Sequence, residues 1–283
     1  MVSVMKKVGI LYHPMKEAAE PLARKLEKFL GAKGVSAWVC SAWEMAAAKA
    51  QVVGTDLVLS IGGDGTILRV AQTVIPGTTP VTGINLGNLG FMTELSVEEA
   101  QLKLTAMLAG EGWIDERSLL EAELSIPGGE GEPAQKFYAL NDVVVARGEV
   151  ARVIYVDASI DGQPLTTYKA DGVIAATATG STGYALSAGG PVLHPQAKEM
   201  LLLPIVPHLS PVYPLVLPST AWIGLRLKST YAATLSVDGH INLPLPSGAL
   251  ITVRHSSNKV RFLRIHPVAS FYASLERRLK GKQ

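Results

Sequence analysis

The segment Asp56–Arg69, DLVLSIGGDGTILR, constrains the fold of this chain more than any other part of the sequence. It opens with the apolar run Leu57–Ile61, interrupted only by Ser60, which is typical of a central strand in a parallel sheet. Three glycines follow within four residues, and Thr66–Leu68 then resembles the first turn of a helix. Backbone N–H groups in such a turn attract anions. The segment therefore predicts a phosphate site between a buried strand and a helix.

Asp64 stands within this turn, where a carboxylate would repel a phosphate unless it had another role. One such role is to accept a proton from an attacking hydroxyl or to help hold a metal ion. The alternative is that Asp64 caps the helix that follows. The turn does not complete a dinucleotide fingerprint, because Leu68 takes the place of its third glycine. Ser181 does not lie in a Gly-x-Ser-x-Gly elbow either, because position 179 is threonine.

Strand-like and helix-like stretches alternate over the first hundred residues. We expect strands over 8–12, 35–39, 56–61 and 79–86, and helices over 17–30, 42–52 and 97–108, besides the helix that follows Asp64. In the first of these helices Leu22, Leu26 and Leu30 recur at helical spacing. The alternation predicts a doubly wound, Rossmann-like α/β domain over residues 1–116, whose ligands bind beyond the carboxyl ends of its strands.

From about Arg117 onward, short alternating runs separated by turns replace the helical spacing. The pairs Asp161-Gly162 and Asp238-Gly239 predict hairpin turns, within 152–169 and 234–243 respectively. Leu250–Ile265 is expected to form a last pair of strands. We therefore predict an all-β domain over residues 117–267, followed by a helical tail over 268–283 that can pack back on the first domain.

The composition narrows the class of protein. A hydrophobic content of 48% and a charged content of 18% indicate an ordered globular chain. A net charge of +2 is too small to favour a nucleic-acid partner. Cys40 is the single cysteine, which excludes an intrachain disulfide and a cysteine zinc site and suits a cytoplasmic protein. We expect no membrane segment, because prolines interrupt the most apolar stretch, 200–216.

Three further groups of residues have possible functional roles. Asn141-Asp142 precedes a valine-rich run, where a strand-edge turn would use the same residues. Phe91 follows the glycine turn Gly87–Gly90 and would either cover a base or pack in a core. The segment Asp171–Pro191, DGVIAATATGSTGYALSAGGP, is rich in small and hydroxylic residues, which make a poor core but a suitable cradle for a ligand. Tyr184 adds an aromatic face there.

Together these motifs resemble the NAD kinases. The resemblance rests on GGDGT at 62–66, NLGF at 88–91, Asn141-Asp142 and the segment 171–191, in matching order, and it covers essentially the whole chain. It implies the fold of the NAD kinase and diacylglycerol kinase-like superfamily, an α/β domain plus an all-β domain. It also implies phosphoryl transfer to the 2′-hydroxyl of the adenosine ribose of NAD, which forms NADP. GGDGT alone is shared with lipid kinases and phosphofructokinases.

The resemblance implies roles for individual residues. Asp64 would be the acid-base residue at the ribose hydroxyl, Phe91 would lie near the adenine, and Asn141 with Asp142 would hold the other ribose. Further substrate contacts are implied at Gly63, Gly65, Arg69, Arg152, Lys169, Asp171, Thr179, Thr182, Gly183, Tyr184, Ser187 and His240. Three positions depart from the usual pattern: Asp142 replaces glutamate, Ala178 replaces proline and Gly183 replaces alanine.

The resemblance further implies a divalent metal, Mg²⁺, carried with the donor phosphates, because the sequence shows no all-protein cage. The donor, ATP or polyphosphate, stays open, as does acceptance of NADH. A homodimer or homotetramer is expected, with Leu201–Leu217 as a route to the interface, unless that stretch folds into the chain's own core. Other functions are a lipid or sugar kinase, for which no acyl-sized apolar pocket is evident between 141 and 191, and a non-catalytic NAD(P) sensor, which the presence of Asp64 disfavours.

Overall fold

The computed structural model describes residues 5–87, 90–128, 134–149, 152–208 and 213–267, together with 271 and 275. The chain divides into two compact units. The α/β unit comprises residues 1–116 and 260–283, and the β unit comprises residues 117–259. Residues 260–267, expected in the β domain, thus group with the α/β unit. The expected helix over 268–283 lies outside the described residues, apart from 271 and 275.

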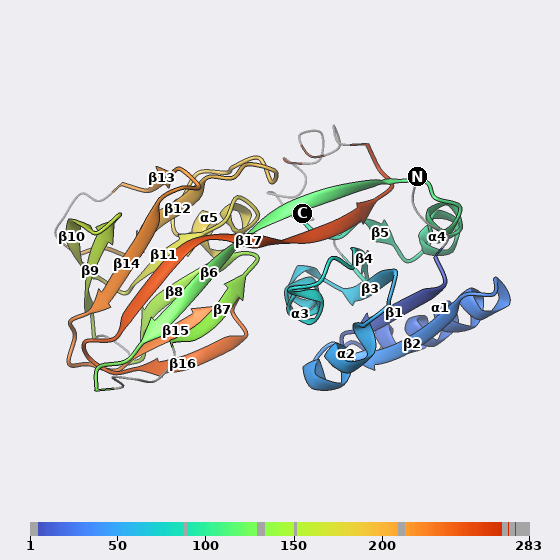
Figure 1. Ribbon diagram of the computed structural model, residues 1–283, viewed down its shortest axis with the longest axis horizontal. Coiled ribbons are helices and arrows are strands. Elements are labelled where there is room, and N and C mark those ends of the chain that lie inside the picture. The colour runs from blue at the N-terminus through green and yellow to red at the C-terminus, as the bar shows by residue number, and fades with distance from the viewer. Residues whose placement is uncertain are drawn as a thin grey trace. The chain divides into compact units, whose positions relative to one another are not determined.

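The α/β unit contains a parallel sheet in the order β4-β3-β1-β2, with β5 beside β4 (Figure 1). Phe262 of β17 pairs in parallel with Val81 of β4. The elements are β1 (Lys7–Tyr12), α1 (Ala19–Ala32), β2 (Ser36–Ser41), α2 (Met45–Val52), β3 (Leu57–Gly62), α3 (Asp64–Val74), β4 (Val81–Asn85), β5 (Leu95–Ser96) and α4 (Ala100–Leu108). The predicted alternation is confirmed. Only β5 was missed, because two residues are too few to form a pattern.

The core of the α/β unit explains why these helices form. Leu22, Leu26 and Leu30 are buried in one cluster with Ile10 of β1 and Leu59 of β3, so the predicted leucine stripe is the packing face of α1. Burial of such side chains stabilises the fold by about 1.5–3 kcal/mol each. This packing holds the carboxyl ends of β1 and β3 side by side.

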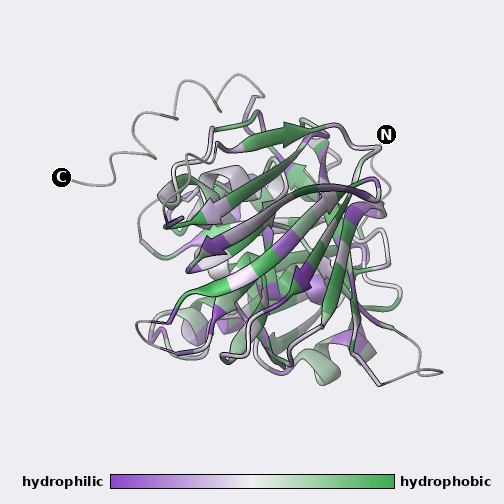
Figure 2. Cartoon of the chain, turned by 90° about the vertical axis from the view of Figure 1, so that its left-hand side faces the viewer, coloured by the Kyte–Doolittle hydropathy of each residue, from purple (hydrophilic) through white to green (hydrophobic). Residues whose placement is uncertain are grey.

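The β unit contains antiparallel sheets around a shared core. One sheet has the order β13-β12-β11-β8-β15-β16; in the other, β10, β9, β14 and β17 are neighbours, and β6 pairs with β17 and β7. The elements are β6 (Trp113–Ser125), β7 (Gln135–Ala139), β8 (Asp142–Arg147), β9 (Ile154–Ile160), β10 (Gln163–Ala170), β11 (Gly172–Ala176), a 3₁₀ turn (Gly180–Thr182), α5 (Tyr184–Ser187), β12 (Met200–Ile205), β13 (Leu215–Leu217), β14 (Trp222–Leu227), β15 (Ala233–Val237), β16 (Ile241–Leu245) and β17 (Leu250–Arg264). Strands facing the viewer in Figure 2 carry green and purple segments in turn, as half-buried strands should.

Both predicted hairpin turns are confirmed. Asp161 and Gly162 have φ of 51° and 78°, and Asp238 and Gly239 have φ of 50° and 69°. Positive φ at both central residues is the geometry of a type I′ turn, which Asp-Gly favours. The prediction of a strand pair over 250–265 is wrong, because β17 is one strand of 15 residues. Its polar run at 256–259 resembles a turn in sequence but continues the strand.

Among the described residues of the apolar stretch 201–217, only 201–205 are buried in the chain's own core, whereas Val206, Tyr213 and Val216 are exposed. Every residue of β12 is buried, whereas β13 is partly exposed. The burial of β12 removes the physical reason to expect a subunit interface along that strand. Residues 209–212 of the stretch lie outside the described part. Among the residues that the structure describes, no helix is long and apolar enough to cross a membrane.

Candidate functional site

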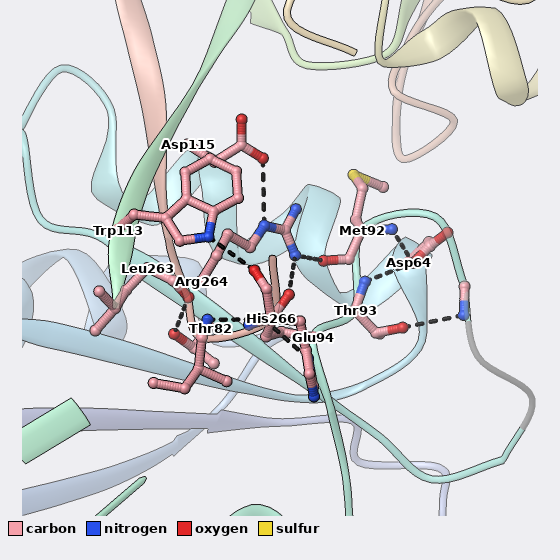
Figure 3. Close-up of polar contacts among 12 residues, drawn as sticks. Asp64, Thr82, Met92, Thr93, Glu94, Trp113, Asp115, Leu263, Arg264 and His266 are labelled. Carbon is pink, nitrogen blue, oxygen red and sulfur yellow. Dashed lines mark hydrogen bonds and ion pairs between the residues drawn. The ribbon is translucent and has the colours of Figure 1, made fainter. Parts of the chain in front are cut away.

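The Asp64 carboxylate binds a second loop rather than capping its own helix. Helix α3 begins at Asp64, directly after β3 and Gly63. The Oδ2 atom accepts a hydrogen bond from the N–H of Phe91 at 2.7 Å. The Oδ1 atom accepts from Met92 at 3.0 Å and Thr93 at 3.3 Å (Figure 3). Three consecutive amides therefore hold the carboxylate beyond the carboxyl end of β3.

Gly90 completes this arrangement. A Cβ atom on Gly90 would overlap the Asp64 carboxylate. The N–H of Gly90 donates to Thr93 Oγ1 at 3.0 Å, which closes the loop on itself. The two glycine turns predicted at this edge of the sheet are thus in contact. Asn88 and Leu89, which belong to the NLGF motif, lie outside the described residues.

Three amides do not exhaust the acceptor capacity of Asp64. An ionised carboxylate offers about four lone-pair positions, two on each oxygen. From the residues that the structure describes, Oδ1 accepts two hydrogen bonds and Oδ2 accepts one. One position on Oδ2 is left for a hydroxyl donor, so Asp64 can orient a substrate hydroxyl while its loop contacts are kept.

A buried arginine supports the loop that binds Asp64. Arg264 Nη1 donates to the carbonyl of Met92 at 2.7 Å and to Glu94 Oε2 at 3.2 Å, and Nε donates to Asp115 at 3.2 Å (Figure 3). Glu94 Oε1 accepts the N–H groups of Ile265 and His266, both at 2.8 Å. This network ties residues 92–94 to the end of β17. Sequence reasoning missed it, because buried charges carry no signature that separates them from surface charges.

In the β unit, the turn of Asn141 and Asp142 is held in a similar way. Asp238 Oδ1 accepts from the N–H of Asn141 at 2.7 Å and of Asp142 at 3.1 Å, and Oδ2 accepts from Leu140 at 2.9 Å. The N–H of Asp238 returns a hydrogen bond to the carbonyl of Asp142 at 3.0 Å. Asp238 was predicted as a turn residue, and its contacts with this distant segment were missed.

The polar side chains of Asn141 and Asp142 lie next to each other in a buried turn. The Oδ1 atom of Asn141 is buried and accepts no hydrogen bond from the residues that the structure describes. Asp142 is 6% exposed. Burial, followed by the negative charge of Asp238, raises the pKa of Asp142 to about 7. Polar groups buried in this state are costly unless a ligand or water satisfies them, so the pair indicates a binding site.

The glycine-rich segment packs against this turn. A Cβ atom on Gly180 would overlap the Asn141 carbonyl, and one on Gly183 would lie 3.3 Å from Asn141 Nδ2. Thr177 Oγ1 donates to the carbonyl of Leu140 at 2.6 Å and accepts the N–H of Gly180 at 3.0 Å. The segment is therefore in contact with Asn141, as the predicted ligand cradle would require.

Several hydroxyls of this segment, which were expected to serve a ligand, form hydrogen bonds within the chain. Thr179 Oγ1 accepts from Arg117 at 3.3 Å, and Thr182 Oγ1 donates to the Thr179 carbonyl at 3.1 Å. Ser181 Oγ donates to the carbonyl of Ala178 at 2.6 Å. Hydroxyls here hold the backbone, because a buried segment must satisfy its own carbonyls. Tyr184 and Ser187, on α5, are exposed.

The other predicted site residues described here contact aromatic rings, a charged side chain or the Asp238 turn. Arg69 stacks over Trp43, with its Cζ 4.3 Å from the ring centroid. Arg152 and Lys169 lie over tyrosine rings at 5.1 and 5.9 Å. Asp171 pairs with Arg147 at 3.1 Å. His240 joins the Asp238 turn through a contact of 3.1 Å between Nδ1 and the Asp238 carbonyl.

The α/β unit carries a glycine-rich turn with the Asp64 carboxylate, and the β unit carries the buried polar turn of Asn141 and Asp142. These features are typical of phosphotransferases of the GGDGT class. Family models match at both units: the ATP-NAD kinase N-terminal domain at residues 14–112 and the ATP-NAD kinase C-terminal domain at 140–265. The chain therefore belongs to the NAD kinase family.

Individual relatives agree with this assignment. An NAD kinase of Dehalococcoides mccartyi is 50% identical, over 98% of this chain and 96% of its own. An NAD kinase of Chloroflexus aggregans is 39% identical, over 98% and 99%. Among solved structures, yeast NADH kinase complexed with NADH has a TM-score of 0.84 at 26% identity, covering 99% of this chain and 89% of that one. An Archaeoglobus fulgidus NAD kinase in complex with ATP has a TM-score of 0.77 at 25% identity, covering 98% and 100%.

Proposed function

We propose that this chain transfers a phosphoryl group to the 2′-hydroxyl of the adenosine ribose of NAD, with Asp64 at the reacting hydroxyl. The observation that carries the assignment is the carboxylate held by three amides with one acceptor position left on Oδ2. Through that position Asp64 orients the hydroxyl and accepts its proton late in the transfer. Positioning and charge neutralisation supply most of the rate, because a ribose hydroxyl is a weak nucleophile.

NAD is held by residues of both motif groups in this proposal. Asn141 and Asp142 bind the second ribose; the support is that the buried Asn141 Oδ1 has no partner among the described residues and that burial raises the pKa of Asp142. Gly63, Gly65 and Phe91 lie beside Asp64 at the adenosine end. Further contacts come from Asp171, Thr182, Gly183, Tyr184, Ser187 and His240. The stacking of Arg69, Arg152 and Lys169 on aromatic rings gives these three residues less support as ligands of phosphate.

The donor we propose is ATP, with polyphosphate as the alternative, and Mg²⁺ is the metal that accompanies it. No three His, Cys, Asp or Glu side chains gather among the described residues. In this proposal the donor phosphates provide most of the metal's ligands, and the Asp64 carboxylate would contribute to its coordination. Such a metal offsets negative charge on the phosphates during transfer. The chain's own part is to position the acceptor.

We also propose a cytoplasmic homodimer or homotetramer. The support is the family membership together with the single cysteine, rather than the apolar strand β12, which is buried in its own unit. Light scattering at micromolar protein measures the assembly directly. A mass near the 30.0 kDa of one chain would contradict it.

A coupled assay tests the function. Purified protein is incubated with NAD, Mg²⁺ and either ATP or polyphosphate, and NADP is read with an NADP-specific dehydrogenase. We expect NADP with at least one donor. Turnover of a lipid or sugar without NADP would replace this proposal with another kinase of the GGDGT class, and NAD binding without turnover would indicate a sensor.

A further inference from the structure

Asp238 occupies the hairpin turn between β15 and β16 and is 5% exposed. Its carboxylate reaches across the sheet edge to three consecutive amides that are 96 to 98 residues away. A turn residue needs no such contact to form a hairpin. We propose that Asp238 is a positioning residue for NAD, which fixes the backbone of residues 140–142 and couples NAD binding at Asp142 to the release of a proton. The inference rests on the proposed assignment of Asn141 and Asp142 to the NAD site.

Hydrogen bonds to Asp238 restrict the backbone of residues 140–142. Bonds of 2.7 to 3.1 Å to the N–H groups of Leu140, Asn141 and Asp142 fix three peptide planes, and the bond from Asp238 N–H to the Asp142 carbonyl fixes a fourth, that between residues 142 and 143. With those planes fixed, only the side-chain torsions of Asn141 and Asp142 remain. Side chains that start from an ordered backbone lose less entropy when a ligand binds.

The carboxyl groups of Asp238 and Asp142 lie in different environments. The Asp238 carboxylate accepts three amide N–H groups. Asp142 accepts no hydrogen bond from the residues described, so burial and the charge of Asp238 act on it without compensation. These two causes, in that order, raise the pKa of Asp142 to about 7. One proton is therefore present on Asp142 for part of the time at neutral pH.

The surroundings of Asp142 contain few other charges. Strand β11 places Ala176 opposite it, and the neighbouring strand β15 presents Val237 opposite Val143. His240 lies in the Asp238 turn and contacts the Asp238 carbonyl through Nδ1. Arg117 contacts Thr179 in the adjacent segment. The like charge of Asp238 is the one electrostatic contribution identified for Asp142 besides burial.

NAD binding then has a definite pH dependence. Ribose hydroxyls donate to an ionised carboxylate more strongly than to a carboxylic acid. Binding lowers the pKa of Asp142 and expels its proton. The affinity is full above pH about 7 and falls by up to about tenfold per pH unit below it, the limit for one proton.

The chain provides a matched control. Asp161 occupies the corresponding place in the other Asp-Gly turn, with φ of 51°. Its carboxylate accepts a single N–H from outside the turn, that of Trp222 at 2.8 Å. Asp161→Asn and Asp238→Asn therefore make the same chemical change in the same type of turn. Only the second removes a charge beside the proposed NAD site.

The experiment is calorimetric titration of NAD from about pH 5.5 to about 8.5, where one-proton linkage is resolved. The wild type and Asp161→Asn should share one profile that weakens below pH about 7. Asp238→Asn should weaken NAD binding at every pH and move the midpoint to lower pH. An unchanged affinity and midpoint in Asp238→Asn would overturn the inference.

A measurement on the wild type alone covers the case in which Asp238→Asn does not fold. Titrations at pH about 6.5 in two buffers of different ionisation enthalpy should report release of a fraction of one proton per NAD. No release would overturn the coupling. The variant Asp142→Asn distinguishes a failure of the proton coupling from a failure of the proposed NAD site. If its NAD affinity and pH profile are unchanged, the assignment of this turn to NAD is wrong.

Discussion

The Oδ2 atom of Asp64 accepts the N–H of Phe91 at 2.7 Å, across 27 residues of sequence. This contact joins the two glycine turns of the α/β unit and places the candidate catalytic carboxylate. In Asp64→Asn the amide keeps the shape but cannot accept a proton. We expect kcat to fall by about 10²- to 10⁴-fold with a nearly unchanged KM for NAD. Steady-state kinetics measure both, and nearly full kcat would reduce Asp64 to a structural residue.

A substitution at Gly90 tests the contact between Asp64 and its partner loop from the loop side. A methyl group there overlaps the Asp64 carboxylate, so Gly90→Ala should displace the carboxylate and lower kcat by at least about tenfold, since small misplacements of catalytic groups are costly. Gly87→Ala is the control, because a Cβ at Gly87 meets nothing within 4 Å. Equal activity of the two variants would show that the loop around Gly90 accommodates the added methyl group without displacing the Asp64 carboxylate.

The parts of the fold that could be predicted are those with a local cause. Asp-Gly turns were predicted because few residue pairs tolerate positive φ at two consecutive positions. The stripe of Leu22, Leu26 and Leu30 was predicted because a helix repeats its buried face every three to four residues. Both signals lie within a short window of sequence.

The contacts of Asp64 and Asp238 could not be predicted, although both residues stood out. Their partners are backbone amides, and since every residue except proline has one, the amides leave no trace in the sequence. The buried ion pairs of Arg264 were missed for a related reason, because Glu94 and Asp115 resemble surface acids until the fold buries them. In β17, the expected pair of strands over 250–265 is one strand of 15 residues, whose polar residues 256–259 continue it.

Arg264 should stabilise the α/β unit strongly. Arg264→Met removes the guanidinium that pairs with the buried carboxylates of Glu94 and Asp115 and should lower the free energy of unfolding by about 3–5 kcal/mol. Arg261→Met is matched, because Arg261 pairs with Glu116 at 3.1 Å on the exposed surface and should cost about 0–1 kcal/mol. Urea unfolding of both variants gives the comparison. Similar losses would show that the buried network adds little.

Thr177 links the glycine-rich segment to the Asn141 turn through one hydroxyl. In Thr177→Val the carbonyl of Leu140 and the N–H of Gly180 both lose their partner in a buried place, so we expect a loss of about 1–3 kcal/mol in unfolding free energy. Because the same bonds hold Gly180 against Asn141, the KM for NAD should rise while kcat changes less.

Thr105→Val is the control, since Thr105 Oγ1 donates at 2.9 Å to Gln101 on an exposed helix face and should change stability by no more than about 0.5 kcal/mol. Thermal unfolding and NAD titration of the two valine variants separate the roles: a stability loss with unchanged KM would confine Thr177 to the core and detach the glycine-rich segment from the binding of NAD.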